Sequence, residues 1–250
     1  MRYAYAGDRE ISVHLLEFLM AQGCAPLALL VSEGKGASHA QELVEKSKLP
    51  KEVIFRGNEF KKKDAIARLK SLNLDYIIGI HFPYLVPKAV LDLPKVGVVN
   101  LHPAYLPYNK GWHTPSWAIV EGKPYGATLH FMEEALDQGD IIHQKQVTVH
   151  ANDTANSLYQ RALQLEEEVF KEAFAELRSL KPRRKPQAAA GTAHLKKDLE
   201  ELRKIELEKT YTAVALLNKL RGLTTNDEKE AAYFEYQGKK IGVQVCFKEF

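Results

Sequence analysis

The stretch that decides the fold and the chemistry of this chain is Val98–Trp117, which reads VVNLHPAYLPYNKGWHTPSW. It opens as an apolar strand that ends at Asn100, and His102 follows two residues later. Alternate residues of a strand share a face, so we expect both polar side chains on the same side of the strand end. Open α/β sheets bind ligands at the carboxyl ends of their strands. The pattern therefore predicts a functional site here.

The residue types at this strand end suit a transfer reaction. An asparagine amide can stabilise a developing oxyanion, and histidine is the side chain best suited to proton transfer near neutral pH. Asp137 lies 35 residues beyond His102, in the acidic loop Glu134–Asp140, and a carboxylate beside a histidine orients its ring. Taken singly, each has a plain structural explanation: a turn asparagine, a packed histidine or a solvated aspartate. The residues by themselves leave these explanations open beside a catalytic one for Asn100, His102 and Asp137.

Around this stretch, short apolar runs alternate with helical patterns. We predict strands at Arg2–Ala6, Leu27–Ser32, Val53–Phe55, Asp75–Ile80 and Gly97–Asn100, and helices at Ile11–Ala21, Ala37–Lys46 and Phe60–Leu72. This alternation predicts an α/β fold with a mostly parallel sheet and helices on both faces. Two later strands, Ala127–Met132 and Ile141–Val149, flank the Asp137 loop, and a long helix follows them.

The stretch Arg178–Pro186 is basic, holds two prolines and contains no acidic residue. We interpret it as a solvated linker, with a basic patch for phosphate or RNA as the alternative. It divides a catalytic domain, residues 1–186, from a C-terminal segment, residues 187–250. That segment is predicted to form a helix over Leu195–Leu220 and a β-hairpin over Ala232–Phe247. A helix and a lone hairpin make a weak core, so we predict a homodimer; folding back onto the main domain is the alternative.

Composition excludes several classes of protein. The chain has 250 residues, of which 45% are hydrophobic and 27% charged, as in globular proteins. Two cysteines cannot form a disulfide framework or a structural zinc site. No apolar run reaches the roughly 20 residues of a membrane span, and the N-terminus lacks a signal-peptide pattern. The net charge of +3 is too small to indicate nucleic-acid binding. We expect a cytoplasmic protein without metal, membrane or nucleic-acid partners.

The combination of NLHPAYLP with the aspartate of ALDQGDII resembles the folate-dependent formyltransferase family. The matching positions are Asn100, His102, Leu106, Pro107, Asp137 and Gly139. The resemblance covers roughly residues 1–180 and implies a Rossmann-like domain, N10-formyltetrahydrofolate as donor and no metal. It also implies roles: His102 as general base, Asn100 as donor to the tetrahedral oxyanion, and Asp137 as the group that holds His102.

The resemblance also implies where the folate lies, between the loop after the fourth strand and the loop before the catalytic aspartate. Here these loops are His81–Val86 and Met132–Asp137. A pterin requires apolar walls with a few polar groups. The implied folate contacts are Phe82, Pro83, Tyr84, Leu85, Met132 and Glu133.

The loop after the strand is similar to that of the sugar N-formyltransferases, which act on nucleotide-linked amino sugars. This similarity implies a 3- or 4-amino deoxysugar, carried by dTDP, as acceptor in the biosynthesis of surface polysaccharide of the O-antigen type in lipopolysaccharide. Tyr105 and Trp112 offer stacking surfaces, and Arg9 and Lys110 are candidates to meet a diphosphate.

Two alternatives remain open. The transfer-RNA enzymes of the family carry a larger second domain and usually a Ser-Leu-Leu-Pro loop, whereas this chain reads Ala104-Tyr105-Leu106-Pro107. Methionyl-tRNA formylation would predict steep salt dependence of binding. A non-catalytic nucleotide-binding module is the other alternative. The first strand and turn, YAYAGDREIS, contain only Gly7, so the three-glycine dinucleotide fingerprint is absent.

Overall fold

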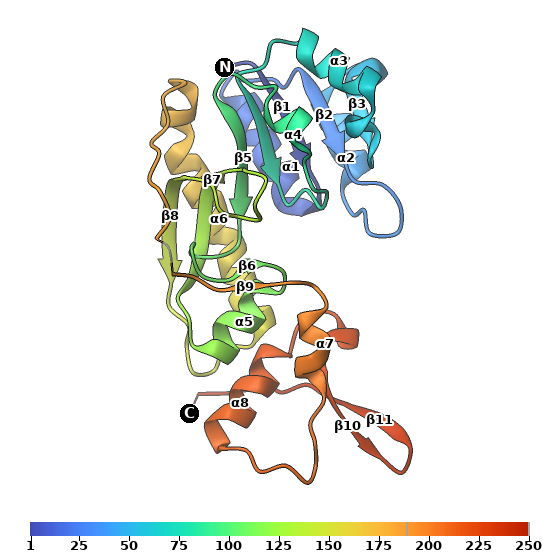
Figure 1. Cartoon of the computed structure of the whole chain (residues 1–250), viewed down its shortest axis with the longest axis vertical. Helices are drawn as coiled ribbons and strands as arrows, with labels where there is room; N and C mark the ends of the chain where they lie inside the picture. Colours follow the sequence, from blue (N-terminus) through green and yellow to red (C-terminus); the bar gives the residue numbers. More distant parts are fainter. Residues whose placement is uncertain (189, 250) are drawn as a thin grey trace. The chain divides into compact units, whose positions relative to one another are not determined.

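The computed structural model describes residues 1–188 and 190–249, and the chain forms two compact units. The first unit comprises Met1–His102, Thr128–His143 and Glu167–Gln187. The second comprises Pro103–Ala127, Gln144–Glu166 and the residues from Ala188 onward. The chain therefore passes between the units several times (Figure 1).

The described chain contains the following elements. The strands are β1 (Tyr3–Gly7), β2 (Ala28–Val31), β3 (Ile54–Arg56), β4 (Tyr76–Ile80), β5 (Gly97–His102), β6 (Lys110–Gly111), β7 (Tyr125–Phe131), β8 (Ile141–Val147), β9 (Ala193–His194), β10 (Ala232–Tyr236) and β11 (Lys239–Val243). The α-helices are α1 (Arg9–Ala21), α2 (Ala40–Ser47), α3 (Lys63–Ser71), α4 (Lys88–Leu91), α5 (Thr114–Glu121), α6 (Ala155–Arg178), α7 (Asp198–Arg203) and α8 (Ala213–Gly222). Short 3-10 turns are η1 (Lys51–Val53), η2 (Glu59–Lys61) and η3 (Glu228–Glu230).

The main sheet has seven strands in the order β3-β2-β1-β4-β5-β7-β8. Strands β1 to β5 run parallel to their neighbours, and β7 is antiparallel to β5. The direction of strand addition reverses between β1 and β4, and such a switch point is where open α/β sheets bind ligands. The predicted α/β class with a mostly parallel sheet is confirmed, and the strands of the first 100 residues lie within a few residues of their predicted ends.

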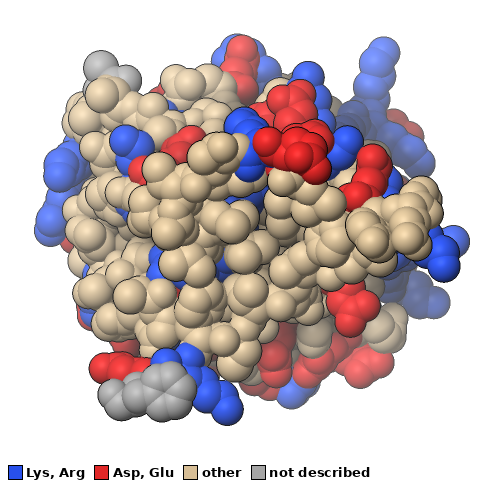
Figure 2. Space-filling view, turned by 90° about the horizontal axis from the view of Figure 1, so that it is seen from below, with Lys and Arg blue, Asp and Glu red and all other residues tan. Residues whose placement is uncertain are grey.

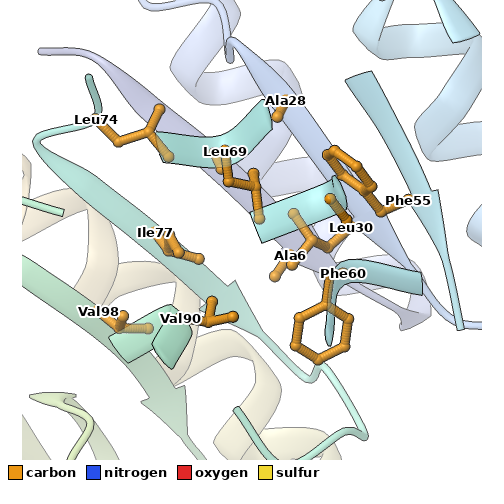
Figure 3. Close-up of a cluster of buried hydrophobic side chains, with 12 residues drawn as sticks. Ala6, Ala28, Leu30, Phe55, Phe60, Leu69, Leu74, Ile77, Val90 and Val98 are labelled. Atoms are coloured by element: carbon orange, nitrogen blue, oxygen red, sulfur yellow. The ribbon is translucent and has the colours of Figure 1, made fainter. Parts of the chain in front are cut away.

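Helices cover both faces of the sheet in the first unit. On one face, α3, α4 and η2 pack over β1, β2, β4 and β5 (Figure 3). This cluster includes the buried side chains of Ala6, Leu30, Phe60, Leu69, Ile77 and Val90. On the other face, the Tyr5 hydroxyl donates to the carbonyl O of Ser12 in α1, at 2.6 Å. The rings of Phe18 and Phe174 meet edge to face at 5.3 Å and join α1 to α6.

Asp8 closes the carboxyl end of β1 and is 1% exposed. Its Oδ1 accepts hydrogen bonds from the backbone N–H groups of Ser38, at 3.0 Å, and His39, at 3.3 Å. Burial raises the pKa of this carboxyl, but hydrogen bonds from backbone N–H groups outweigh burial and lower the pKa below its ordinary value of 3.8. Asp8 therefore ties the loop after β2 to the end of β1.

We expect Asp8→Asn to lower the free energy of unfolding by about 1–3 kcal/mol at pH 7, because hydrogen bonds to a charged acceptor are replaced by weaker ones. A carboxyl whose folded pKa is depressed stabilises the fold above its unfolded pKa, and that contribution is lost as the pH falls through the folded value. Urea unfolding at pH 7, 4 and 3 should show a constant difference between the two proteins down to about pH 4 and a narrowing of that difference below it. A difference that is independent of pH would contradict this role.

The second unit contains α5, α8 and two small strand pairs. β6 pairs with β9, and the Trp117 ring stacks on the His194 ring with centroids 3.7 Å apart. β10 and β11 form the predicted hairpin, although it is shorter than expected. Gln237 and Gly238 close it with φ of 48° and 75°, as a type I′ turn requires.

The prediction of one helix over Leu195–Leu220 is wrong, because the chain forms two helices, α7 and α8, in this region. Between them, the Ile205 N–H donates to the carbonyl O of Tyr233 in β10, at 2.7 Å. Backbone groups that bond to the hairpin are not available to a helix. α8 then begins afresh, where the Thr212 side chain accepts a hydrogen bond from the Ala215 N–H at 3.2 Å.

The basic stretch Arg178–Pro186 is tied to the first unit. Nη2 of Arg183 lies 3.2 Å from Oε1 of Glu176. The Arg184 guanidinium stacks over the Phe131 ring, 3.5 Å from its centroid. These contacts favour a linker over a basic patch for phosphate or RNA.

Candidate active site

The pairing of β5 with β7 places Asn100 opposite His130, and His102 opposite Thr128. Asn100 Nδ2 lies 3.4 Å from His130 Nε2, and His130 Nδ1 lies 2.7 Å from the carbonyl O of Phe131. A carbonyl only accepts, so Nδ1 carries the proton. In the neutral ring Nε2 is then an acceptor for the Asn100 amide. The fully buried His130 therefore orients that amide.

The Asp137 carboxylate lies between two imidazole rings. Its Oδ2 is 3.5 Å from His102 Nε2, and its Oδ1 is 3.6 Å from His130 Nε2. The side chains of His102 and Asp137 are only 9% and 8% exposed. The separation from His102 lies within ion-pair range for a protonated ring but exceeds a direct hydrogen bond of about 2.7–3.2 Å. The second separation is a close approach to the Nε2 that a neutral His130 leaves unprotonated. Small movements of the Asp137 loop therefore decide whether this carboxylate bonds to His102.

The loop that carries Asp137 turns tightly against the end of β7. Asp137 itself has φ of 50°, in the left-handed region. A Cβ placed on Gly139 would lie 2.1 Å from the carbonyl O of Phe131, so no side chain fits there. The Phe131 N–H donates to the carbonyl O of Asp140 at 2.9 Å and anchors the end of the loop. This close approach explains why a glycine follows the aspartate.

An apolar cavity lies beside Asn100 in the first unit. Three of the predicted folate contacts line it: Phe82, Tyr84 and Met132. The rest of its wall comes from Ala6, Leu30, Ile77, Gly79, Val86, Val98 and Asn100. The cavity is small, with a volume of about 10 Å³, so it offers an apolar wall beside Asn100 and not a formed space for a ring system. The Tyr84 hydroxyl accepts a hydrogen bond from the Glu33 N–H at 3.1 Å.

The other predicted contacts in the first unit lie outside this lining. Pro83 and Glu133 are exposed, and Leu85 is 77% exposed. The Arg9 side chain is 52% exposed, with Nε 3.8 Å from Oδ2 of Asp8. The structure therefore brings three of the six predicted folate contacts to one cavity.

Tyr105, Lys110 and Trp112 belong to the second unit. Trp112 is 44% exposed, and the ammonium of Lys196 lies 5.3 Å from the centroid of its ring. The backbone N–H of Lys110 donates to the carbonyl O of Thr192 at 2.9 Å. An exposed aromatic ring beside a cation suits a ligand that carries both a ring and negative charge.

The sequence alone did not indicate His130. The residue lies within the apolar strand YGATLHF, where a histidine is most simply a packed core residue. Only the register between β5 and β7 places it opposite Asn100. The feature of the sequence that could have pointed to His130 is a histidine within an apolar strand that leads into the Asp137 loop.

Two further observations concern the described residues as a whole. Within residues 1–188 and 190–249, no three His, Cys, Asp or Glu side chains are grouped so as to hold a metal ion. The same residues include no helix that is both long enough and apolar enough to span a membrane.

Residues 20–174 match a family model described as formyl transferase, and they include Asn100, His102 and Asp137. The chain belongs to the formyl transferase family. Residues 198–249 match a second model, described as the N-formyltransferase dimerization C-terminal domain. The resemblance to the formyltransferases is therefore confirmed, and it extends beyond the catalytic part of this formyltransferase.

Known relatives of this formyltransferase include sugar-modifying enzymes. A dTDP-4-amino-4,6-dideoxyglucose formyltransferase of Mycobacterium bovis is 34% identical over 70% of this chain and 74% of its own length. A sugar N-formyltransferase of a Shewanella species has a similar fold, with a TM-score of 0.85, 22% identity, and coverage of 100% of this chain and 99% of its own. A formyltransferase of Anoxybacillus kamchatkensis, solved with UDP-4,6-dideoxy-4-formamido-L-AltNAc and tetrahydrofolate, is 26% identical, with a TM-score of 0.60, and covers 88% of this chain and 97% of its own.

The comparisons also bear on the two alternatives. A methionyl-tRNA formyltransferase of Clostridioides difficile is 28% identical over 70% of this chain, but only 58% of that enzyme is covered. The Mycobacterium bovis sugar enzyme matches at the higher identity of 34% with 74% of its length covered, and residues 198–249 match the N-formyltransferase dimerization domain. The prediction of the sugar branch is thus confirmed over the transfer-RNA branch, and the family match opposes a non-catalytic nucleotide-binding module.

Proposed function

We propose that this enzyme transfers the formyl group of N10-formyltetrahydrofolate to the amino group of a nucleotide-linked 4-amino deoxysugar, with dTDP as the carrier. The observation that carries this proposal is the convergence of Asn100, His102 and Asp137 at one strand end, beside an apolar cavity lined by Asn100 itself. The Mycobacterium bovis relative, named for a dTDP-4-amino sugar, supports the acceptor. We also propose that this product serves the biosynthesis of surface polysaccharide of the O-antigen type.

The residues divide the reaction between them. The acceptor amine attacks the formyl carbon, and the bond from that carbon to N10 of the folate breaks. His102 takes the proton that the amine loses and returns one to the departing N10. Asn100 donates an N–H to the oxyanion that forms at the formyl carbon. Asp137 orients His102 and balances the charge that the ring gains.

His130 is a positioning residue in this scheme. One N–H of the Asn100 amide points to His130 Nε2, at 3.4 Å between the nitrogens. The second N–H of the same amide is then directed by that contact, and we assign it to the oxyanion. His130 is 0% exposed and therefore keeps a fixed orientation.

Binding residues follow from the same surfaces. Phe82, Tyr84 and Met132 provide apolar walls for the pterin ring, and we retain Pro83, Leu85 and Glu133 as contacts at the exposed rim. For the acceptor we propose stacking on Tyr105 and Trp112, with Lys110 of the same unit as a partner of the diphosphate. Arg9, in the first unit, stays a separate candidate for a phosphate contact. The structure of the Anoxybacillus kamchatkensis relative, which holds tetrahydrofolate and a UDP-linked 4-formamido sugar, supports this pair of ligands.

Incubation of the purified enzyme with N10-formyltetrahydrofolate and a panel of amino-sugar nucleotides tests the proposal. The panel contains dTDP- and UDP-linked sugars with the amine at position 3 or 4, together with methionyl-tRNA. Mass spectrometry should show one added formyl group, with the highest kcat/KM for a dTDP-linked 4-amino sugar. Formylation of methionyl-tRNA alone would overturn the proposal. Preference for a 3-amino sugar would overturn only the assignment of the acceptor amine to position 4.

We propose that residues 187–250 supply the contacts of a homodimer, while residues 1–186 supply the catalytic machinery. The match of residues 198–249 to a dimerization domain supports this. Large apolar side chains of this segment are exposed, among them Val214 at 65%, Leu217 at 46% and Tyr236 at 59%. Exposed apolar side chains of this kind mark association surfaces. Figure 2 shows uncharged residues over much of the face on view, with Lys, Arg, Asp and Glu side chains among them and gathered at its edge.

We expect the double variant Val214→Glu and Leu217→Glu to be a folded monomer, because it places two charges in an apolar contact without disturbing the core. Light scattering should give the mass of a dimer for the natural chain and of a monomer for the variant. The exposed pair Glu42→Gln and Glu45→Gln on α2 is the control. A dimeric double variant would place the interface elsewhere.

We also propose that the enzyme works in the cytoplasm. Cys24 and Cys246 are both free thiols, as is usual in a reducing compartment.

A further inference from the structure

Gln187 lies at the end of the first unit and reaches back to the loop that carries Asp137. Its Nε2 is 2.8 Å from the carbonyl O of Asp137 and 2.8 Å from the carbonyl O of Gly139. Because both carbonyls only accept, the amide is fixed with its nitrogen toward the loop. One side chain, distant in the sequence, therefore holds both ends of the Asp137–Gly139 turn.

The clamp acts together with the contact at the end of the loop, where the Phe131 N–H donates to the carbonyl O of Asp140. Glu133, Glu134, Ala135, Leu136 and Gln138 are all exposed, so burial holds the loop only at Asp137 and Gly139. Asp137 also adopts the left-handed conformation, which a non-glycine residue keeps only where its surroundings hold it. The Gln187 amide supplies two hydrogen bonds at this point.

We propose that Gln187 is a positioning residue for formyl transfer, which holds the Asp137 carboxylate where it faces the His102 ring. The inference rests on the proposed function. The Asp137 Oδ2 to His102 Nε2 separation is 3.5 Å, so a further shift of the loop by an ångström removes the contact. Misplacement by about 1 Å can lower a rate about 100-fold. Gln187 does not touch the reacting atoms in this scheme and acts through Asp137.

Two substitutions separate clamping from packing. Gln187→Met keeps the size of the side chain and removes the donor. Gln187→Asn keeps the donor but shortens its reach, so that it can serve at most one carbonyl. We expect kcat to fall by about 10–100-fold in Gln187→Met and less in Gln187→Asn, with both KM values within about twofold of those of the natural enzyme. If Gln187 only fills space, kcat should fall more in Gln187→Asn than in Gln187→Met, because methionine replaces the lost volume and asparagine does not.

Controls and a double variant complete the test. Gln41→Met makes the same chemical change on the exposed face of α2, and Lys185→Ala alters the same linker without touching the loop. Both should leave kcat unchanged. In an Asp137→Ala background, Gln187→Met should lower the residual kcat no further, since the group it positions is gone.

The outcomes separate this inference from the proposed function. A natural enzyme that formylates no amino-sugar nucleotide overturns the proposed function. A natural enzyme that is active, with Gln187→Met of equal kcat, overturns the role of Gln187 alone. An undiminished effect of Gln187→Met in the Asp137→Ala background also overturns it, because that effect would then be structural.

Discussion

Replacing His102 by alanine should lower kcat for formyl transfer by about 10²–10⁴-fold, the usual effect of removing a general acid–base group. Asp137→Ala should act in the same direction, because the carboxylate that faces His102 Nε2 at 3.5 Å is lost. The double variant should be no slower than the slower single variant, since residues that act as one unit do not add. Single-turnover assays with saturating donor and acceptor measure this.

The controls replace another histidine and another aspartate by alanine, both at exposed positions of the first unit. His14→Ala removes a histidine whose side chain is 49% exposed, and Asp64→Ala removes an exposed aspartate of α3. Both should retain the kcat of the natural enzyme. Circular dichroism must show all variants folded. A folded His102→Ala enzyme with near-normal turnover would exclude His102 as the proton-transfer group.

Asn100→Ala should lower kcat by about 10²–10³-fold and change KM little, because a hydrogen bond to an oxyanion strengthens in the transition state. The amide is well placed for this, since it lines the apolar cavity and is oriented by the buried His130. Asn58→Ala, at an exposed turn, is the matched control. An effect of Asn100→Ala confined to KM would show that the amide binds the substrate without stabilising the oxyanion.

His130 provides a second check on this assignment. If His130 acts by orienting Asn100, then His130→Ala should lower kcat in the natural enzyme and have a smaller effect in the Asn100→Ala background. Additive losses would show that the two side chains act independently.

The sequence by itself determined the α/β class, the order of strands and helices in the first 100 residues, and the polar pair Asn100 and His102. These follow from local rules. Strand and helix periods are written in neighbouring residues, and Asn100 and His102 share a face because a strand alternates. The family motif added the distant Asp137, which no local pattern could connect to His102.

Only the tertiary structure decided the rest. The antiparallel register of β5 and β7 put His130 opposite Asn100, and the return of the chain at Gln187 clamped the Asp137 loop. It also divided the predicted helix after Leu195, because Ile205 bonds to the hairpin in place of a helical turn. Each of these contacts joins residues distant along the chain. Their energies depend on packing that no window of neighbouring residues contains, which is why local patterns do not reveal them.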